Sequence, residues 1–232
     1  MAVNVVYEDN HLIAVNKASG DITQGDKTGD EPLPEKIKRW LAKKYDKKGN
    51  VFCGVIHRLD RPTSGLVIFS KTSKALSRMN ELFKKQEVQK VYWAIVESKP
   101  KEDSGCLLDY LKKNKKQNKS YSVKKGTPEA KESVLDYKLI AQSDRYYLLE
   151  VHPKTGRHHQ IRTQLSNIGC IIKGDVKYGA KRSNKDGSIS LHARSATFIH
   201  PVKKEPIEIT AKVPNDPLWK WFEKEVEKTV DI

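Results

Sequence analysis

The chain has 232 residues, of which 37% are hydrophobic and 31% charged, a balance typical of a globular domain and not of a disordered chain. Lysine and arginine number 44 against 29 acidic residues, and the net charge of +15 favours a polyanionic partner, either a nucleic acid or an anionic membrane surface. No apolar run reaches transmembrane length and no strongly amphipathic basic helix lies at a terminus, so a nucleic acid is the better expectation.

The cysteines Cys53, Cys106 and Cys170 are scattered, odd in number and without a CxxC motif. This pattern predicts free thiols in a reducing compartment. The first residues carry acids early and lack the basic start and long apolar stretch of a signal peptide, so we expect a cytoplasmic protein.

At the N-terminus, two short strands over residues 3–7 and 12–15 are expected to pair around a turn at 8–11. Residues 21–34 are rich in Gly, Asp, Thr and Pro and predict a loop. Helical spacing of apolar residues then predicts a helix over 33–45.

Residues 54–69 are the stretch around which the rest of the chain is organised. Residues 66–69 are continuously apolar and predict a buried strand, and the turn ahead of them carries Arg58, Asp60 and Arg61. A charged turn joined to a buried strand is a common place for chemistry. A surface turn with a local Arg–Asp pair explains the same composition, and both readings stay open on these residues alone.

Thr72 is a suitable N-cap for a helix over residues 73–85. Residues 90–96 alternate as a strand does, so one side carries Val91, Trp93 and Ile95 and the other carries Tyr92, Ala94 and Val96.

Within residues 99–130, seven lysines and no acid lie between Lys112 and Lys125. Tyr121 and Val123 give the segment weak strand character and indicate one arm of a basic hairpin. A solvated loop is the alternative, but the absence of any balancing acid favours an arm that contacts phosphates.

The remaining chain predicts strands at 132–141, 146–151, 189–193, 197–200 and 207–213, a helix at 156–168 that stops at Gly169, and a last helix at 218–228 capped near Asp216. Neighbouring strands mixed with helices favour an α+β fold with a largely antiparallel sheet over repeated βαβ units.

If the helix at 156–168 begins at Gly156, its first turn carries Arg157, and His158 shares a face with Arg162. A helix start with these residues suits anions, although an exposed basic helix is equally compatible with the composition. His158 and His159 are adjacent and are expected to point apart. With no HExxH motif, we expect no metal site.

The stretch HRLDRPTSG at residues 57–65 resembles the HRLDxxTSG signature of the RluA-type pseudouridine synthases. Further segments resemble family motifs in the same order: NKASG at 16–20, with Ala18 where proline is usual, KVYWAIV at 90–96, GRHHQIR at 156–162, GDVKYG at 174–179 and LHA at 191–193. The resemblance extends over nearly the whole chain.

The resemblance implies an α+β pseudouridine synthase fold, with a mixed, mainly antiparallel sheet flanked by helices and loops and a central RNA-binding cleft. It implies one catalytic domain over residues 1–232 without a separate N-terminal RNA-binding domain. The enzyme is then an isomerase, an intramolecular transferase that flips a uridine of ribosomal or transfer RNA out of its stack and converts it to pseudouridine. Neither a cofactor nor a metal is expected.

By this resemblance Asp60 is the catalytic nucleophile, and whether it attacks the ribose or the base stays open. Arg162 is the matched partner that keeps the carboxylate ionised and oriented. Tyr92 matches the tyrosine that stacks on the target base, although an ordinary strand aromatic explains it equally well without the family.

We expect the substrate to be an RNA stem-loop bound by a monomer, with specificity from the loops at 21–34 and 99–130. The residues assigned to RNA binding are Lys17, His57, Arg58, Thr63, Lys115, Lys116, Lys119, Arg157 and His159.

Two rival functions are weaker. A non-catalytic RNA-binding protein on the same fold would have lost Asp60, Tyr92 or Arg162, and all three are present. A metal-dependent nucleotide hydrolase would need clustered carboxylates, and the motifs supply only one acid near the basic groups.

Overall fold

The computed structural model describes residues 3–25 and 29–230, with side chains up to residue 228. These residues divide into two compact units. The first runs to Gln89 and includes Ala193–Lys212, and the second comprises Lys90–His192 and the residues from Val213 onward.

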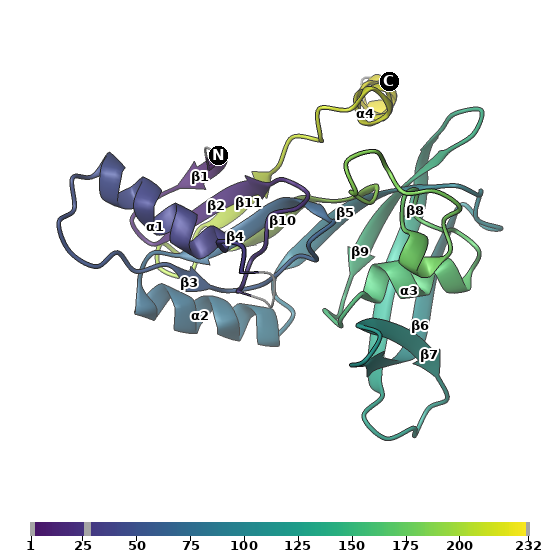
Figure 1. The fold of residues 1–232 in the computed structure, drawn as a ribbon, viewed down its shortest axis with the longest axis horizontal. Coiled ribbons are helices and arrows are strands. Elements are labelled where there is room, and N and C mark those ends of the chain that lie inside the picture. Colours follow the sequence, from purple (N-terminus) through teal and green to yellow (C-terminus); the bar gives the residue numbers. More distant parts are fainter. Residues whose placement is uncertain (1–2, 26–28, 231–232) are drawn as a thin grey trace. The chain divides into compact units, whose positions relative to one another are not determined.

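The strands of the first unit form a sheet in which four strand pairs are antiparallel (Figure 1). Its order is β1 (Val5–Glu8), β2 (Leu12–Lys17), β4 (Ser64–Ser70) and β10 (Leu191–Ile199), while β3 (Gly54–Val55) pairs with β4 and β11 (Pro206–Thr210) with β10. The predicted N-terminal strand pair is confirmed. The two segments expected at 189–193 and 197–200 are one continuous strand, β10.

The two helices of this unit lie close to their predicted positions. In α1 (Leu33–Lys44), residues such as Ile37 and Leu41 are buried. In α2 (Ser73–Lys84), the Thr72 hydroxyl accepts a hydrogen bond from the Ala75 amide at 3.2 Å, which confirms the predicted N-cap. The α2 helix packs against β3 and β4.

All seven residues of β4 are buried, which confirms the buried strand predicted after the charged turn. Its second residue, Gly65, has φ +113°, and a Cβ there would lie 2.3 Å from the Ala193 carbonyl oxygen. Only glycine fits this position, because both the backbone angle and the available space exclude a side chain.

The second unit has an antiparallel sheet in the order β5-β9-β8-β6-β7. The strand bounds are β5 (Gln89–Val96), β6 (Ser104–Asn114), β7 (Lys119–Val123), β8 (Lys131–Gln142) and β9 (Tyr147–Pro153). Strands β6 and β7 form the basic hairpin that the lysine-rich segment predicted.

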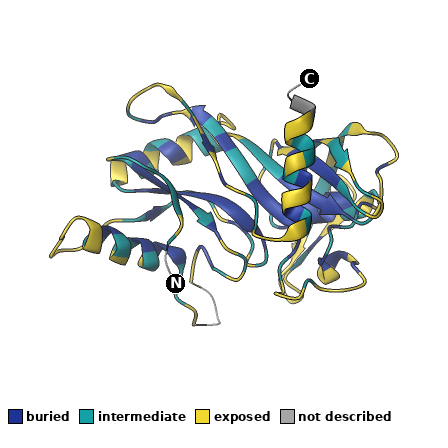
Figure 2. Ribbon diagram, turned by 90° about the horizontal axis from the view of Figure 1, so that it is seen from above, coloured by how far each residue is buried: buried dark blue, intermediate teal, exposed yellow. Residues whose placement is uncertain are grey.

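The helices of this unit are α3 (Gln160–Asn167), α4 (Pro217–Val230) and a single 3₁₀ turn, η1 (Val176–Tyr178). Figure 2 shows buried stretches along the strands and exposed ones on helix surfaces and loop ends. The Asp216 carboxylate accepts hydrogen bonds from the Leu218 and Trp219 amides, so the predicted cap of α4 is confirmed.

The strand β5 separates two hydrophobic clusters. Trp93 and Ile95 pack with Phe222 of α4, whereas Ala94 packs with Leu165 of α3. The alternation predicted for residues 90–96 is therefore confirmed.

The predicted start of the helix at Gly156 is wrong, because α3 begins at Gln160. His159 has φ +53°, which is outside helical geometry. The Gln160 side chain accepts hydrogen bonds from the Thr155 hydroxyl and the Arg157 amide, and these contacts hold the preceding residues in a turn. The rings of His158 and His159 stack 3.8 Å apart at 20°, so the expectation that they point apart is also wrong.

Both units combine antiparallel strands with helices, which confirms the α+β class. Cys53, Cys106 and Cys170 are free thiols. Among the described residues, no helix has the length and apolar character needed to cross a bilayer. The single catalytic domain and the central cleft stay predictions.

Candidate active site

Asp60 lies in the first unit, in the loop that joins β3 to β4. Its side chain is half-buried, and its carbonyl accepts a hydrogen bond from the Thr63 amide at 3.0 Å, which closes a tight turn. Leu59 beside it is buried, and Ser64 begins the buried strand. The turn is thus fixed to the core at Leu59, directly before Asp60, and again at Ser64, where the strand begins.

Lys17, at the end of β2, holds this loop in place from the protein interior. It is 1% exposed, and its ammonium donates to the carbonyls of Ala18 (2.9 Å), Arg61 (3.1 Å) and Thr63 (2.7 Å). An ammonium has three N–H donors, and three carbonyls accept them, so the buried charge is fully hydrogen-bonded.

The predicted phosphate contact by Lys17 is therefore wrong. A lysine in an apolar β2–β4 environment loses most of its hydration, and burial lowers the pKa of Lys17 to about 8, opposed by the negative charges of Asp21 and Asp60. The attraction between the Lys17 ammonium and the Asp60 carboxylate favours an ionised carboxylate.

His57 holds the other end of the loop. Its Nε2 accepts a hydrogen bond from the Ile68 amide at 3.0 Å, and its ring stacks on Phe83 of α2 at 5.0 Å. Thr63 is only 2% exposed. These contacts of His57 and Thr63 are within the protein. Their predicted RNA contacts stay predictions.

The arginines on either side of Asp60 contact the loop at 21–34. The exposed Arg58 donates to the Gln24 side chain at 2.9 Å, and Arg61 forms an ion pair with Asp30 at 2.5 Å. The Arg61–Asp30 pair therefore ties the Asp60 turn to the loop at 21–34. Residues 26–28 of the predicted loop lie outside the described residues.

In the second unit, Arg162 of α3 forms a buried bidentate pair with Asp175. Its Nε donates to Oδ2 at 2.6 Å and its Nη2 to Oδ1 at 2.8 Å, and the two residues are 4% and 1% exposed. This geometry fixes the plane and direction of the guanidinium. The predicted partnership of Arg162 with Asp60 stays a prediction.

Tyr178 of η1 connects this pair to the basic hairpin. Its hydroxyl accepts a hydrogen bond from the Ser120 amide and also contacts His159 Nδ1, each at 2.9 Å. The Arg162 guanidinium lies over its ring at 5.0 Å and the Lys119 ammonium at 4.8 Å. Burial raises the pKa of Tyr178, so at neutral pH it is a protonated hydrogen-bonding group.

Asp175 and Tyr178 lie in the GDVKYG segment that resembles a family motif, but the sequence analysis assigned neither of them a role. The available signal was an acid and an aromatic between Gly174 and Gly179, both of which have positive φ, but nothing local connects them to Arg162. Long-range packing decides that contact.

The other predicted site residues of this unit lie outside the Arg162–Asp175 pair. Tyr92 of β5 is half-buried and packs against the cluster under α3. Arg157 is exposed and donates to the Glu132 carbonyl at 3.0 Å, while His159 is 8% exposed. RNA contacts by Arg157 and His159 stay predictions.

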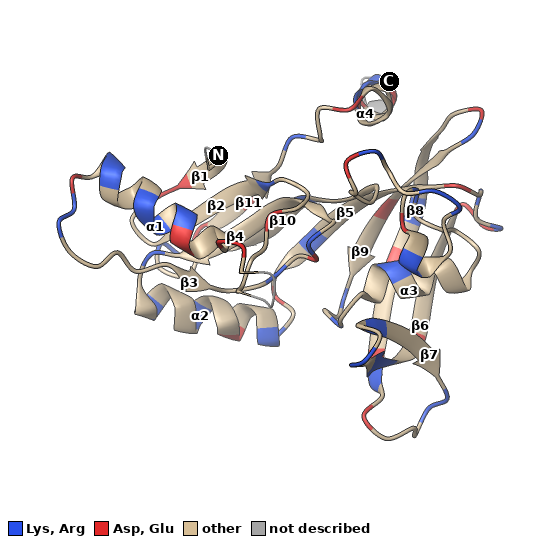
Figure 3. Cartoon of the chain, in the orientation of Figure 1, with Lys and Arg blue, Asp and Glu red and all other residues tan. Residues whose placement is uncertain are grey.

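The lysines of the hairpin lie at its tip and on β7. Lys115 and Lys116 are exposed in the turn between the strands, and Lys119 begins β7. Lys and Arg, blue in Figure 3, recur along the hairpin. RNA contacts by these three lysines stay predictions.

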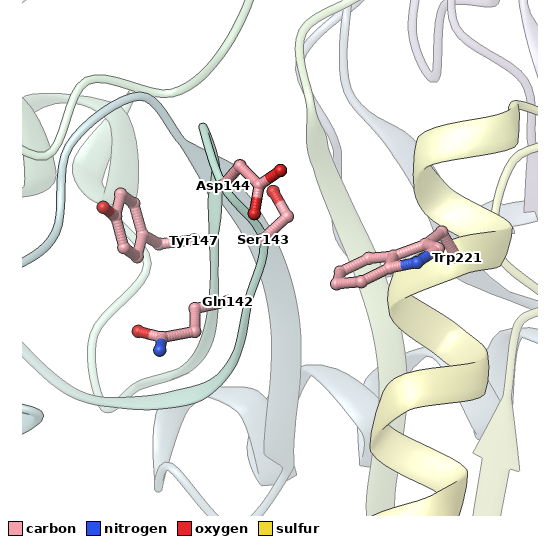
Figure 4. A pocket seen from close by; sticks show the side chains of 5 residues that line it. All are labelled: Gln142, Ser143, Asp144, Tyr147 and Trp221. Carbon is pink, nitrogen blue, oxygen red and sulfur yellow. The ribbon is translucent and has the colours of Figure 1, made fainter.

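A separate pocket of the second unit lies between the β8–β9 turn and α4 (Figure 4). It is lined by Gln142, Ser143, Asp144, Tyr147 and Trp221. None of the predicted site residues lines it. Within residues 3–25 and 29–230, no group of three or more His, Cys, Asp or Glu side chains is arranged to hold a metal ion.

Residues 11–167 match the family model described as RNA pseudouridylate synthase. The chain belongs to the pseudouridine synthase family, and its relatives place it in the RluA-type group. It is 30% identical to the tRNA pseudouridine synthase C of Vibrio parahaemolyticus, over 94% of this chain and 92% of the relative. It is 32% identical to the ribosomal large subunit pseudouridine synthase C of Rickettsia felis, over 90% of this chain and 67% of the relative.

The fold is also that of solved pseudouridine synthase structures. Human RNA Pseudouridylate Synthase Domain Containing 4 aligns with a TM-score of 0.77 at 21% identity, over 97% of this chain and 93% of that one. The family establishes this pseudouridine synthase as an isomerase that converts uridine to pseudouridine in RNA.

Proposed function

We propose that this pseudouridine synthase modifies a uridine in an unpaired loop of transfer or ribosomal RNA, with Asp60 as the nucleophile. The two named relatives, one a tRNA enzyme and the other a ribosomal enzyme, support these two RNA classes equally. A loop is the favoured target because an unpaired base leaves its stack at the lowest cost.

The observation that carries the assignment of Asp60 is the support beneath it. A half-buried carboxylate sits on a turn whose carbonyls are held by the buried Lys17 ammonium, and the positive charge of Lys17 favours the ionised form. A nucleophile must be ionised and held in one direction, and this support supplies both.

Tyr92 and Arg162 serve the same reaction in our proposal. The bidentate pair with Asp175 holds the Arg162 guanidinium in one orientation, so Arg162 can stabilise negative charge without first losing side-chain freedom. Tyr92 offers an aromatic ring for stacking on the target base. Arg58 is exposed and contacts RNA backbone or fills the space that the flipped base leaves.

We further propose that the enzyme acts as a cytoplasmic monomer. Its three free thiols suit a reducing compartment, and a net charge of +15 opposes self-association. Sedimentation of the purified protein tests the oligomeric state.

The deciding experiment replaces Asp60 by asparagine, which keeps the shape and removes the nucleophile. Turnover is followed by release of tritium from uracil C5, since that hydrogen leaves when the new carbon–carbon bond forms. We expect Asp60→Asn to abolish release while RNA affinity stays within about twofold, because the change is local. Appreciable residual turnover would contradict the assignment.

Two controls accompany this test. Transfer RNA and ribosomal RNA from cells that lack the gene are offered separately, which identifies the substrate class. Excess EDTA is added to the wild-type reaction, and we expect activity to survive. Loss of activity on chelation would favour the metal-dependent alternative.

The hairpin is tested by neutralising Lys115, Lys116 and Lys119 together to glutamine. RNA affinity should fall, and the slope of log affinity against log salt should decrease by about 2, because each phosphate contact contributes about 0.7–0.9. The matched control neutralises three exposed lysines of α2 and its C-cap, namely Lys74, Lys84 and Lys85. If both triple variants behave alike, the hairpin contributes only to net charge.

A further inference from the structure

One face of the β6–β7 hairpin combines aromatic and basic side chains. In the antiparallel register Lys112 lies opposite Tyr121, Tyr110 opposite Val123, and Asn114 opposite Lys119. Residues directly opposite each other, and residues two apart along a strand, share a face. Tyr110, Lys112, Lys119 and Tyr121 therefore project from the same side, which we call the tyrosine face.

The central ring of the tyrosine face is accessible and has a cation beside it. Tyr121 is 40% exposed, and the Lys119 ammonium lies 5.3 Å from its ring centre. The Tyr121 hydroxyl donates to the Gln117 side chain at 2.6 Å, which holds one edge of the ring in place. A second cation, Lys125, lies 5.8 Å from the ring of Tyr110.

The opposite side of the hairpin is fastened to the body of the second unit. Ser120 is 2% exposed, its amide donates to Tyr178, and its hydroxyl donates to the His158 carbonyl at 2.7 Å. Asn118 in the turn contacts His158 Nε2 at 3.1 Å. Because β7 is held at these points, the tyrosine face is already ordered before RNA binds, and binding does not incur the entropy cost of ordering it.

This combination matches one kind of ligand. Proteins bind unpaired nucleic acid by stacking bases on aromatic rings while nearby cations hold the phosphates. A continuous duplex offers only phosphates and groove edges, because its bases are already stacked on each other. An exposed tyrosine among lysines therefore distinguishes a looped RNA from a paired one, whereas lysines alone do not.

We propose that the tyrosine face is a second RNA-binding site, which stacks one unpaired nucleotide of the substrate on Tyr121 and holds its flanking phosphates with Lys112 and Lys119. The inference rests on the proposed function for its RNA substrate and adds to it a selection for looped RNA. The contact lies outside the residues proposed to carry out the chemistry.

The test measures binding of a short RNA stem-loop and of a blunt RNA duplex of equal length. We expect Tyr121→Ala to weaken stem-loop binding about tenfold, the scale of one base stacked on an aromatic ring. Duplex binding and the salt slope should stay unchanged, because no charge is removed. Tyr121→Phe retains the ring and should bind both RNAs within about twofold of wild type.

Trp221→Ala is the matched control, because Trp221 is an equally exposed aromatic on α4, also 40% exposed. It should bind both RNAs as wild type does. The proposal is overturned if Tyr121→Ala binds the stem-loop normally, if it loses stem-loop and duplex equally, or if Trp221→Ala gives the same selective loss.

Urea unfolding of Tyr121→Ala checks that a selective loss does not come from a melted hairpin. If the fold is lost, the comparison moves to Tyr121→Leu, which fills the site without a π-face and should show the same selective loss. The binding measurement does not depend on turnover. If no pseudouridine forms, the proposed function is refuted, but a selective loss of stem-loop binding in Tyr121→Ala would still support the tyrosine face as an RNA-binding site.

Discussion

Replacing Lys17 by methionine removes the ammonium beneath the Asp60 loop while keeping nearly the same volume. The carbonyls of Ala18, Arg61 and Thr63 then lose an ionised donor in the protein interior. Each such loss costs about 1–3 kcal/mol. The fall in the pKa of Lys17 from 10.5 to about 8 corresponds to about 3 kcal/mol of unfavourable burial, which the methionine no longer incurs.

The cost of the three lost hydrogen bonds, less the burial cost that methionine avoids, predicts that Lys17→Met lowers the free energy of unfolding by about 3 kcal/mol. Urea unfolding measures this change, and Lys138→Met, at an exposed lysine of β8, is the control expected to stay within about 0.5 kcal/mol. Tritium release should fall as well, since the carbonyls position the Asp60 turn. An unchanged urea midpoint together with normal turnover would refute the view that Lys17 holds the loop.

Two further predictions concern charge in the interior. The folded pKa of Lys17, about 8, is below its unfolded value of 10.5, so between these pH values the unfolded chain binds more protons than the folded one. The free energy of unfolding of wild type, relative to that of Lys17→Met, should therefore rise as pH increases through this window. A difference between the two proteins that does not change with pH, measured by urea unfolding, would contradict this. Asp175→Asn leaves the buried Arg162 guanidinium without its carboxylate and should lower the free energy of unfolding by about 3–5 kcal/mol, whereas Asp103→Asn, which breaks the exposed pair with Lys99, should change it by less than about 1 kcal/mol.

Elements with a strong local pattern were predicted closely. The unbroken apolar run at 66–69 is the centre of β4, and the alternation of residues 90–96 separates the two hydrophobic clusters of the second unit. Thr72 and Asp216 cap the helices that they were expected to cap. In each case a short stretch of sequence carries enough information, because periodicity and capping act over a few residues.

The segment before α3 shows where local patterns fail. Arg157, His158 and His159 have acceptable helix propensity, but the side chain of Gln160 binds back to the Thr155 hydroxyl and the Arg157 amide, and His159 takes a left-handed conformation. A side chain that competes with the helix for backbone donors moves the helix start by four residues, and composition does not reveal that competition.

The motif at residues 57–65 determined the family of this protein without any structure, because its nine residues form a specific signature and further motifs follow in order. Only the tertiary structure decided what supports Asp60. Lys17, 43 residues before it, was expected from the sequence to contact RNA, and the structure places it in the interior beneath the turn. Sequence shows that a charge is present, but which groups satisfy that charge depends on contacts that folding brings together.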